Sequence, residues 1–472
     1  MQPSIVWLRN DLRLADNPAL RAAVDRGAPV IAVFIWSPEE EGNWAPGAAG
    51  LSWLHRSLES FQQDCSSIGL RLVLKSGPPL DVLKEVVDET GAGAVFWNRR
   101  YEPLGIACDT RVKAGLKKEG VEVESFPGNV LFEPWDIKNQ EGKPYKVFTP
   151  FWKACLKKGR PPAPLPKVTK AGKRAPECSS LELEDLGLLP VEDWDKKIFN
   201  KWQVGEKAAK RRLLAFLNDK ILDYKKERDF PGKEGVSRMS PHLHFGEISP
   251  GIIWEEAHKR HSGREEGVKC YLSEIGWREF AHHLLFHFPR TPDRPLYKKF
   301  EAFKWRNAKK DLKAWQSGMT GYPIVDAGMR QLWETGWMHN RVRMIVGSFL
   351  VKDLLISWKK GAEWFWDTLV DADLANNTLG WQWVGGCGAD AAPYFRIFNP
   401  ITQGERFDPD GDYVRKWVPE LKKIPKKWIH HPWDAPEEEL KGLVLGDDYP
   451  VPIVDHKEAR DRALEAFSFL ST

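Results

Sequence analysis

The sequence predicts an α/β domain followed by an all-α domain, and three observations carry this prediction. Short apolar runs alternate with amphipathic helical stretches from residue 4 to residue 126. A stretch rich in proline and basic residues follows at 157–177. From about residue 200 onward the strand pattern disappears, and long segments with the period of a helix replace it. We therefore expect a parallel-sheet domain over 1–130, a connecting linker over 131–200 and an all-helical domain over 201–472.

The first domain is predicted from five apolar runs rich in β-branched and aromatic residues. These runs are SIVWL (4–8), PVIAVFIW (29–36), LRLVL (70–74), AVFWN (94–98) and VEVESF (121–126). The helical stretches between them cover 17–27, 50–65, 79–91 and 106–120. This alternation is typical of a Rossmann-like parallel sheet with crossover helices. The first turn, RNDLRLADN (9–17), carries no glycine, so the G-x-G-x-x-G cradle of an NAD domain is absent.

The linker and the second domain are predicted from composition and period. The stretch 157–177 holds five prolines and seven Lys or Arg residues against one Glu, which favours an extended, solvated crossover. The segments with helical period that follow cover 206–224, 269–288, 309–318 and 342–370. These long helical segments predict an all-α domain of roughly 270 residues.

Charge, hydropathy and cysteine usage exclude several classes of protein. No run approaches 18 apolar residues, and the N-terminus lacks the pattern of a signal peptide, so we expect no membrane association. The six cysteines form no C-x-x-C pair, which disfavours metal knuckles and disulfides and favours a reducing, cytoplasmic compartment. A net charge of +4 is too small to indicate nucleic-acid binding by itself.

Tryptophan is unusually frequent, and one short segment concentrates it among carboxylates and amides. The chain holds 23 Trp residues against 9 Tyr. The segment DADLANNTLGWQW (371–383) contains two Asp, two Asn and two Trp, and it lacks the His, Cys, Ser or Lys of an acyl-transfer site. Indoles stack on planar ligands and bases, and they also pass electrons.

The histidines and the small hydroxyl residues offer weaker signals. His283 and His287 share a helix face, but the glutamate of H-E-x-x-H is missing, as it is near His242 and His244, so we expect no metal site. The segment 235–250 opens with glycine and two hydroxyls, Ser237 and Ser240, which suits a phosphate grip at the start of a helix.

Two further segments combine an acid or amide, an apolar plate and an arginine. In WMHNRVRM (337–344), Asn340 and Met344 lie one turn apart if the segment is helical. In EIGWRE (274–279), Glu274 lies near Trp277. Arginine grips phosphates and aromatic plates stack bases, so the pair of segments favours a nucleic-acid ligand. Each segment alone would fit an ordinary amphipathic helix.

The chain resembles the photolyase/cryptochrome flavoprotein family, nearly from end to end. The likeness begins at VWLRNDLRLADNPAL and continues through ERDFPGKEGVSRMSPHLHFGEISP, WREF, MTGYPIVDAGMRQLWETGWMHNRVRM, DADLANNTLGWQW and DAAPYFRIFNP. The resemblance implies an N-terminal antenna domain, a linker and a helical domain that binds FAD. It also implies light-driven repair of cyclobutane pyrimidine dimers by electron transfer from reduced flavin, which needs no nucleophile.

Roles at the flavin are implied by the resemblance, residue by residue. Asn377 is expected against the central reactive nitrogen of the flavin, and Asp371 is expected to pair with Arg343 beside the ring. The electron chain from flavin to surface would be Trp381, Trp358 and Trp305. The other positions expected to hold FAD are Tyr224, Val236, Ser237, Arg238, Met239, Ser240, Tyr271, Glu274, Ala372 and Asp373.

The substrate side is implied in the same way, with UV-damaged DNA as the partner of a monomeric, cytoplasmic protein, nucleoid-associated if bacterial. The lesion pocket would comprise Glu274, Trp277, Asn340, Met344 and Trp383. Contacts to DNA phosphates would come from Arg228, Arg278 and Arg341. The antenna is expected to be 5,10-methenyltetrahydrofolate, stacked on Trp44 with Glu102 nearby, and a deazaflavin is the alternative. Val236 departs from the threonine of many relatives, and Cys387 has no assigned role.

Three other activities compete with dimer repair. A cryptochrome photoreceptor is disfavoured because Asn377 is an amide where plant-type receptors carry an acid, and because the chain ends soon after the helical domain. Repair of the 6–4 photoproduct is disfavoured because His339 is followed by Asn340, where that branch has a second histidine. A flavin oxidoreductase that works in the dark would leave the row of indoles unexplained.

Overall fold

The computed structural model describes residues 1–470, which form two compact units. The first unit comprises 1–222, 237–289 and 370–375, and the second comprises 223–236, 290–369 and the chain from 376 onward. No helix among residues 1–470 is long and apolar enough to cross a lipid bilayer.

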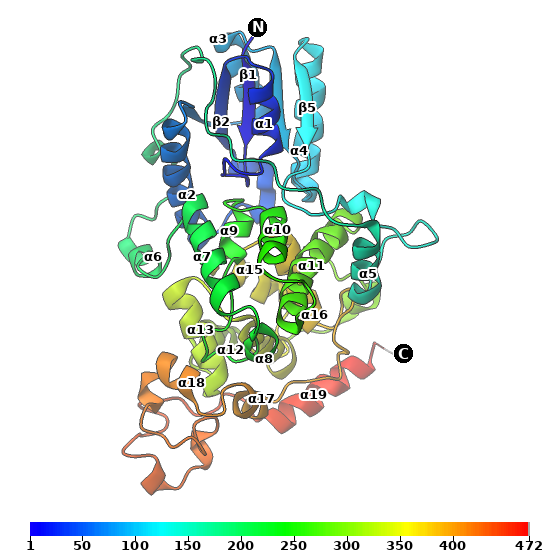
Figure 1. The fold of residues 1–472 in the computed structure, drawn as a ribbon. Coiled ribbons are helices and arrows are strands. Elements are labelled where there is room, and N and C mark those ends of the chain that lie inside the picture. The colour runs from blue at the N-terminus through cyan, green and yellow to red at the C-terminus, as the bar shows by residue number, and fades with distance from the viewer. Residues whose placement is uncertain (471–472) are drawn as a thin grey trace. The chain divides into compact units, whose positions relative to one another are not determined.

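A five-stranded parallel sheet forms the N-terminal part of the first unit (Figure 1). The strand order is β3-β2-β1-β4-β5, and each neighbouring pair is parallel. The predicted α/β architecture is therefore confirmed, with the runs of branched residues in the buried strands. The strands are β1 (Ser4–Leu8), β2 (Val30–Trp36), β3 (Leu72–Ser76), β4 (Ala94–Asn98) and β5 (Glu122–Phe126).

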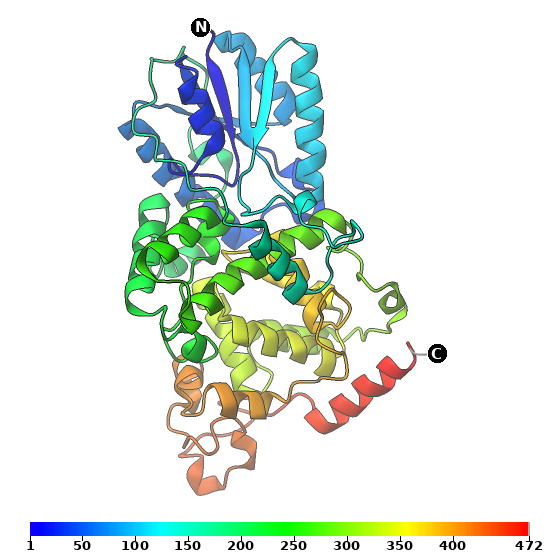
Figure 2. The same cartoon turned by 45° about the vertical axis from the view of Figure 1, so that its right-hand side comes forward.

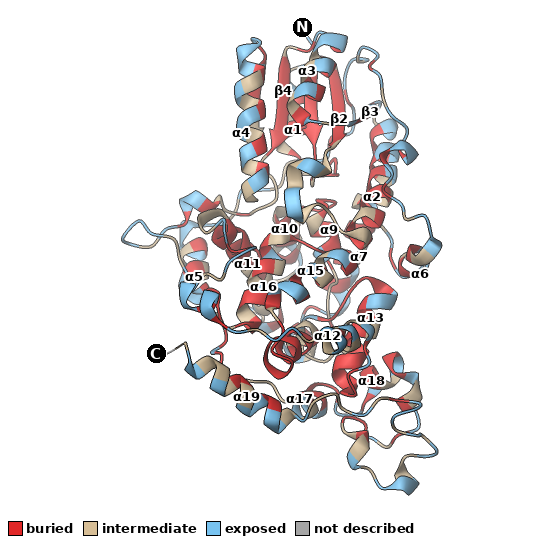
Figure 3. Ribbon diagram, turned by 180° about the vertical axis from the view of Figure 1, so that it is seen from behind, coloured by how far each residue is buried: buried red, intermediate tan, exposed pale blue. Residues whose placement is uncertain are grey.

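Crossover helices cover the sheet because each presents an apolar stripe to it. The core on one face combines strand residues such as Ile5 and Val95 with Val86 and Val112 from two helices. Burial follows the period of a helix, with buried and exposed sides on the same element (Figure 3). These helices are α1 (Pro18–Asp25), α2 (Ala48–Ser67), α3 (Pro79–Thr90) and α4 (Pro103–Lys118), with the short η1 (Pro38–Trp44) before α2.

One helix of the first unit, α5 (Phe148–Lys158), was not predicted from the sequence. It lies within the predicted linker and packs against α11 (Glu266–His287) (Figure 2). The segment from 160 to 181 has no helix or strand, as expected of the proline-rich crossover. The other helices of this unit are η2 (Pro134–Asp136), η3 (Glu184–Leu186), η4 (Asp193–Asp195), α6 (Lys196–Phe199), α7 (Glu206–Asp219), α9 (Ser240–His244) and α10 (Pro250–Arg260).

The second unit is helical, as predicted, but its longest predicted helix is broken. The segment 342–370 contains the end of α14 (Asn340–Ser348), a π-helical turn η6 (Phe349–Asp353) and α15 (Trp358–Thr368). Leu355 has a φ of 54°, a left-handed conformation that ends the helical path. The remaining helices are α8 (Tyr224–Glu227), η5 (Lys298–Ala302), α12 (Lys309–Ser317), α13 (Pro323–Thr335), α16 (Leu374–Val384), α17 (Pro400–Phe407), α18 (Asp412–Trp417), η7 (Pro419–Leu421), η8 (Pro432–Asp434), η9 (Glu437–Glu439) and α19 (His456–Ser468).

Candidate flavin and DNA site

A serine loop and an aspartate meet within the first unit. The Ser240 hydroxyl, at the start of α9, donates to Oδ2 of Asp371 over 2.5 Å. Two residues earlier, Arg238 has a φ of 51°, which non-glycine residues rarely adopt outside sites that over-determine the backbone. The structure thus joins two of the segments that the resemblance assigned to the cofactor, 237–240 and 371–373.

Asp373 lies between two imidazoles in the same unit. Its Oδ2 is 3.5 Å from Nδ1 of His244 and 3.9 Å from Nε2 of His282. Burial alone would raise the pKa of Asp373, but the nearby charges of His282, His244 and Arg278 and the hydrogen bond from His244 hold it below its ordinary value. Asp373 is therefore held as a carboxylate in the fold.

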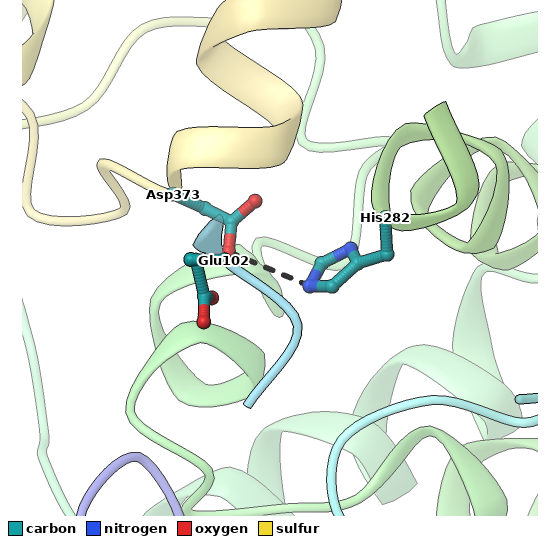
Figure 4. Close-up of side chains that lie close together, drawn as sticks. All are labelled: Glu102, His282 and Asp373. Atoms are coloured by element: carbon teal, nitrogen blue, oxygen red, sulfur yellow. Dashed lines mark ion pairs between the residues drawn. The ribbon is translucent and has the colours of Figure 1, made fainter. Parts of the chain in front are cut away.

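Glu102 completes a cluster with His282 and Asp373, in which one ligand atom from each lies within 4.8 Å of the others (Figure 4). The His282 ring bonds the Arg278 carbonyl oxygen through Nδ1 at 3.1 Å, so Nδ1 carries a proton and Nε2 faces the two acids. Both acids have other partners as well: His244 lies beside Asp373, and Arg100 lies beside Glu102.

Glu102 also belongs to a chain of charges that reaches the predicted antenna residue Trp44. Nε of Arg100 lies 3.8 Å from a carboxylate oxygen of Glu102, and its Nη1 donates to Glu41 over 2.6 Å. Glu41 and Trp44 both belong to η1. Within the first unit, the half-buried Arg100 thus joins Glu102 to the short helix that carries Trp44.

Helix α11 carries four of the predicted site residues. Tyr271 packs against Phe216 with ring centroids 4.6 Å apart, and burial raises the pKa of Tyr271 to about 12, so it stays a neutral hydroxyl. Glu274 and Trp277 lie one turn apart and are half-buried. Arg278 is buried and donates to the Asn129 carbonyl oxygen, so it braces the linker and does not face solvent.

In the second unit, Asn377 and Arg343 are oriented by main-chain carbonyls. Asn377 Nδ2 donates to the carbonyl oxygen of Ala362 over 3.1 Å. Its amide oxygen is consequently the atom left for a ligand, because the two ends of an amide point apart. Arg343 Nε donates to the carbonyl oxygen of Met338 over 2.8 Å. The predicted pairing of Arg343 with Asp371 stays a prediction.

Helix α14 begins at the predicted lesion residue Asn340. The preceding His339 is buried and caps the helix, because its Nδ1 accepts from the Arg341 amide over 3.2 Å. Asn340 is exposed, and Met344 follows one turn later. The Arg341 guanidinium donates to Asp229 Oδ1 over 2.8 Å and lies 4.3 Å from the Phe407 ring centroid. Arg228 Nε is 4.0 Å from the same Asp229 oxygen.

The three indoles of the predicted electron chain become more exposed toward the predicted surface end, Trp305. Trp381 and Trp358 are buried, whereas Trp305 is half-buried and contacts Phe303 with ring centroids 4.4 Å apart. Trp381 is held against α15, where a Cβ on Gly361 would lie 2.0 Å from the indole. The other predicted residues are placed as follows: Tyr224, Met239 and Ala372 are buried, and Val236, Ser237 and Trp383 are half-buried.

Each unit, taken by itself, carries groups that suit a flavin dinucleotide. The first unit offers hydroxyls and carboxylates, and the second offers an amide oxygen and a guanidinium, which a ribityl chain, a ring edge and phosphates require. His244 and His282 were considered from the sequence only as metal ligands, together with His242, His283 and His287, and not as partners of Asp373. Asp229 and Ala362 were missed, because a lone acid and a main-chain carbonyl carry no signal in a sequence. His283 and His287 both bond the Pro134 carbonyl oxygen.

Comparisons with known proteins match both parts of the chain. Residues 4–168 match the family model described as DNA photolyase, and residues 271–469 match the FAD binding domain of DNA photolyase. A deoxyribodipyrimidine photo-lyase of Agrobacterium fabrum is 50% identical over 99% of this chain and 98% of its own. Cryptochrome-1 of Arabidopsis thaliana is 42% identical over 98% of this chain and 70% of its own.

A solved structure has the same fold. It is the crystal structure of a bacterial class III photolyase from Agrobacterium tumefaciens, with a TM-score of 0.96, 49% identity, and coverage of 100% of this chain and 98% of that one. This structural match and the sequence matches agree over the whole length. The chain belongs to the photolyase/cryptochrome family and carries its FAD-binding domain.

Proposed function

We propose that this protein repairs cyclobutane pyrimidine dimers in UV-damaged DNA with light, as a monomer with bound FAD. When bound, FAD supplies a light-driven electron to the lesion. The protein's own residues bind and orient the FAD and the lesion, and they exclude water. The observation that carries the proposal is the hydrogen bond from Asn377 to Ala362. It fixes a neutral amide at a position where the family's plant-type photoreceptors carry an acid.

The neutral amide matters because of charge. An amide oxygen accepts from a ring N–H without bringing a second negative charge close to an anionic reduced cofactor. The Ala362 carbonyl favours an amide at residue 377, since an amide can donate to it and an ionised carboxylate cannot. The names of the relatives support the same activity, since the Agrobacterium fabrum photo-lyase is 50% identical over the full chain.

Residues proposed to hold the flavin and the lesion keep the roles that the resemblance implies. Asp371, Asp373 and Arg343 would hold the ring and ribityl chain, and the segment 237–240 with Tyr224 would hold the phosphates. Trp277, Glu274, Asn340, Met344 and Trp383 would receive the flipped dimer. Arg228 and Arg341 would contact phosphates. We assign no DNA contact to Arg278, because it is buried and bonded to Asn129.

Repair of 6–4 photoproducts is the second candidate, and one contact disfavours it. His339 directly precedes α14 and is followed by Asn340 where a second histidine would be needed, and its Nδ1 already caps the helix by accepting from the Arg341 amide. A methenyltetrahydrofolate antenna is proposed at Trp44 and Glu102, since Arg100 joins Glu102 to Glu41 of the short helix that carries Trp44.

The test is an absorption measurement on the purified protein. Reduced protein is mixed with oligothymidylate that carries cyclobutane dimers and is then exposed to blue light. Recovery of thymine absorbance is expected, with none in the dark and none on an oligonucleotide that carries only 6–4 photoproducts. A flavin band with light-dependent spectral change but no recovery on either substrate would overturn the proposal in favour of a photoreceptor.

A further inference from the structure

Trp277 is one end of a stack of three aromatic rings in the first unit. The Phe148 ring lies almost parallel to it, with centroids 3.9 Å apart and an interplanar angle of 11°. The Trp152 ring is also nearly parallel to Phe148, with centroids 6.4 Å apart and an interplanar angle of 12°. Phe148 and Trp152 are one turn apart on α5, so one helix face supplies both rings.

Helices α5 and α11 approach each other closely at this stack. A Cβ on Gly276 would lie 2.7 Å from the Trp152 ring, so a glycine is needed where that ring meets α11. Phe280, one turn after Trp277, contacts the Trp277 ring by its edge, with centroids 5.9 Å apart and planes at 74°. Trp277 is thus held between a stacked ring, Phe148, and a nearly perpendicular one, Phe280.

Trp277 keeps part of its ring accessible although Phe148 covers one of its faces. Phe148 is buried, whereas Trp277 is half-buried. A base that stacks on this indole meets a plate whose plane is already set. A fixed plate avoids the loss of side-chain freedom that a mobile indole would suffer on binding.

We propose that Phe148 is a positioning residue for the lesion: by stacking on one face of Trp277 it presets the plane of the indole on which a flipped pyrimidine dimer stacks. The inference rests on the proposed function, since it assumes Trp277 as the lesion plate. It gives the helix within the linker a part in damage recognition. Phe148 touches neither DNA nor flavin in this role and acts only through the indole.

The test compares Phe148→Leu, which keeps an apolar side chain but removes the ring, with Phe148→Tyr, which keeps the ring. Dissociation constants are measured for damaged and undamaged duplexes at one salt concentration. Phe148→Leu should weaken damaged-duplex binding about 2- to 10-fold, the range of an aromatic pair, and leave undamaged-duplex binding unchanged. Phe148→Tyr should restore the parent value.

A double variant separates positioning from general packing. In a Trp277→Ala background, Phe148→Leu should cause no further loss, because the plate it positions is gone. The matched control is Phe286→Leu, the same change on α11, where Phe286 contacts Trp135 at 5.6 Å. This control should bind both duplexes like the parent. The flavin absorption spectrum and the thermal midpoint report folding, and Phe148→Met replaces Phe148→Leu if the latter loses flavin.

The outcomes separate this inference from the proposed function. A parent protein without preference for damaged DNA would defeat the proposed function. If the parent prefers damaged DNA and Phe148→Leu binds the damaged duplex with the same dissociation constant as the parent, only the inference about Phe148 is overturned. Equal losses by Phe148→Leu with and without Trp277 would also overturn it, because Phe148 would then act through the fold.

Discussion

Asn377 donates its side-chain N–H to the main-chain carbonyl oxygen of Ala362 over 3.1 Å, which joins α16 to α15 and orients the amide. A carboxylate at residue 377 would place an acceptor against that carbonyl oxygen and, at the position proposed for Asn377, a negative charge beside the cofactor.

Asn377→Asp should therefore disfavour the anionic reduced flavin. We expect the resting protein to move toward more oxidised forms of the flavin, visible in its absorption spectrum after photoreduction. Asn376→Asp is the matched control, since it makes the same change at an exposed neighbour on the same helix, and it should behave like the parent. An Asn377→Asp protein that holds the reduced anion as well as the parent would refute the placement of Asn377.

Trp381→Phe should abolish photoreduction of the oxidised flavin. Trp381 is buried and fixed against Gly361, so its loss removes the indole at the inner end of the proposed chain to Trp305. Repair should survive when the flavin is reduced chemically beforehand, because electrons for repair move toward DNA. The control is Trp315→Phe, a buried indole in edge contact with Trp381 at 6.2 Å that lies outside the proposed chain. Loss of repair in pre-reduced Trp381→Phe would contradict the separation of the two paths.

Asp229→Asn should raise affinity for undamaged DNA. One oxygen of Asp229 lies 2.8 Å from Arg341 and 4.0 Å from Arg228, so the carboxylate offsets charge that both arginines would offer to phosphates. Each additional phosphate contact should steepen the dependence of log affinity on log salt by about 0.9. The stability of the fold should change little, because partly exposed ion pairs contribute about 0–1 kcal/mol.

The control for this change is Asp25→Asn, which removes one carboxylate from an exposed ion pair with Arg21 on α1. It alters the net charge equally and should leave the salt slope at the parent value. A slope that rises equally in both variants would assign the effect to net charge.

The sheet could be predicted from sequence because its signal is local: five branched runs separated by helices specify a parallel sheet. The breaks in the helices of the second unit could not be predicted, because residue 355 is left-handed although leucine normally continues a helix. Helix α5 was not predicted because the sequence around it is rich in proline, although Phe148, Phe151 and Cys155 are buried at helical spacing. Motif resemblance supplied Asn377 but not its partner Ala362, because a carbonyl contact depends on packing alone.

Arg278 shows a second limit of sequence reasoning. An arginine beside a predicted lesion residue was expected at the DNA surface, and the structure buries it against Asn129. The neighbouring Glu279 is buried too, and one of its oxygens accepts from the amides of Leu131 and Phe132 at 2.7 and 3.1 Å. Both residues serve to attach the linker to α11.

Glu279→Gln should change how stability depends on pH. Burial raises the pKa of Glu279 to about 7, despite the opposing effects of Arg278 and the two amides. Because the folded pKa is raised, the stabilising contribution is present below the unfolded pKa and is lost as pH rises through about 7. The loss in this window amounts to about 1.4 kcal/mol per pH unit at most.

The measurement is the urea midpoint of unfolding from pH 5 to pH 8, taken as the difference between variant and parent so that histidine titrations cancel. The parent should lose more stability than Glu279→Gln as pH rises. Glu206→Gln is the control, because Glu206 also accepts from two consecutive amides, those of Leu14 and Ala15, but is partly exposed. A parent and a Glu279→Gln variant with parallel profiles would show that Glu279 is ionised in the fold at pH 5 and above.

Trp277→Ala should separate damaged from undamaged DNA. A dimer must leave the duplex to reach a flavin in a helical domain, at a cost of a few kcal/mol that is lower for a damaged pair. The indole that receives it contributes about 1–3 kcal/mol by stacking, so its removal should weaken damaged-duplex binding roughly 5- to 150-fold. Undamaged-duplex binding depends on phosphates and should barely change, with the flavin spectrum unaltered. Trp333→Ala is the control, because Trp333 is 58% exposed and stacks on Trp364 with centroids 6.0 Å apart. This control should bind both duplexes like the parent, whereas an equal loss on both duplexes by Trp277→Ala would make Trp277 a packing residue of α11.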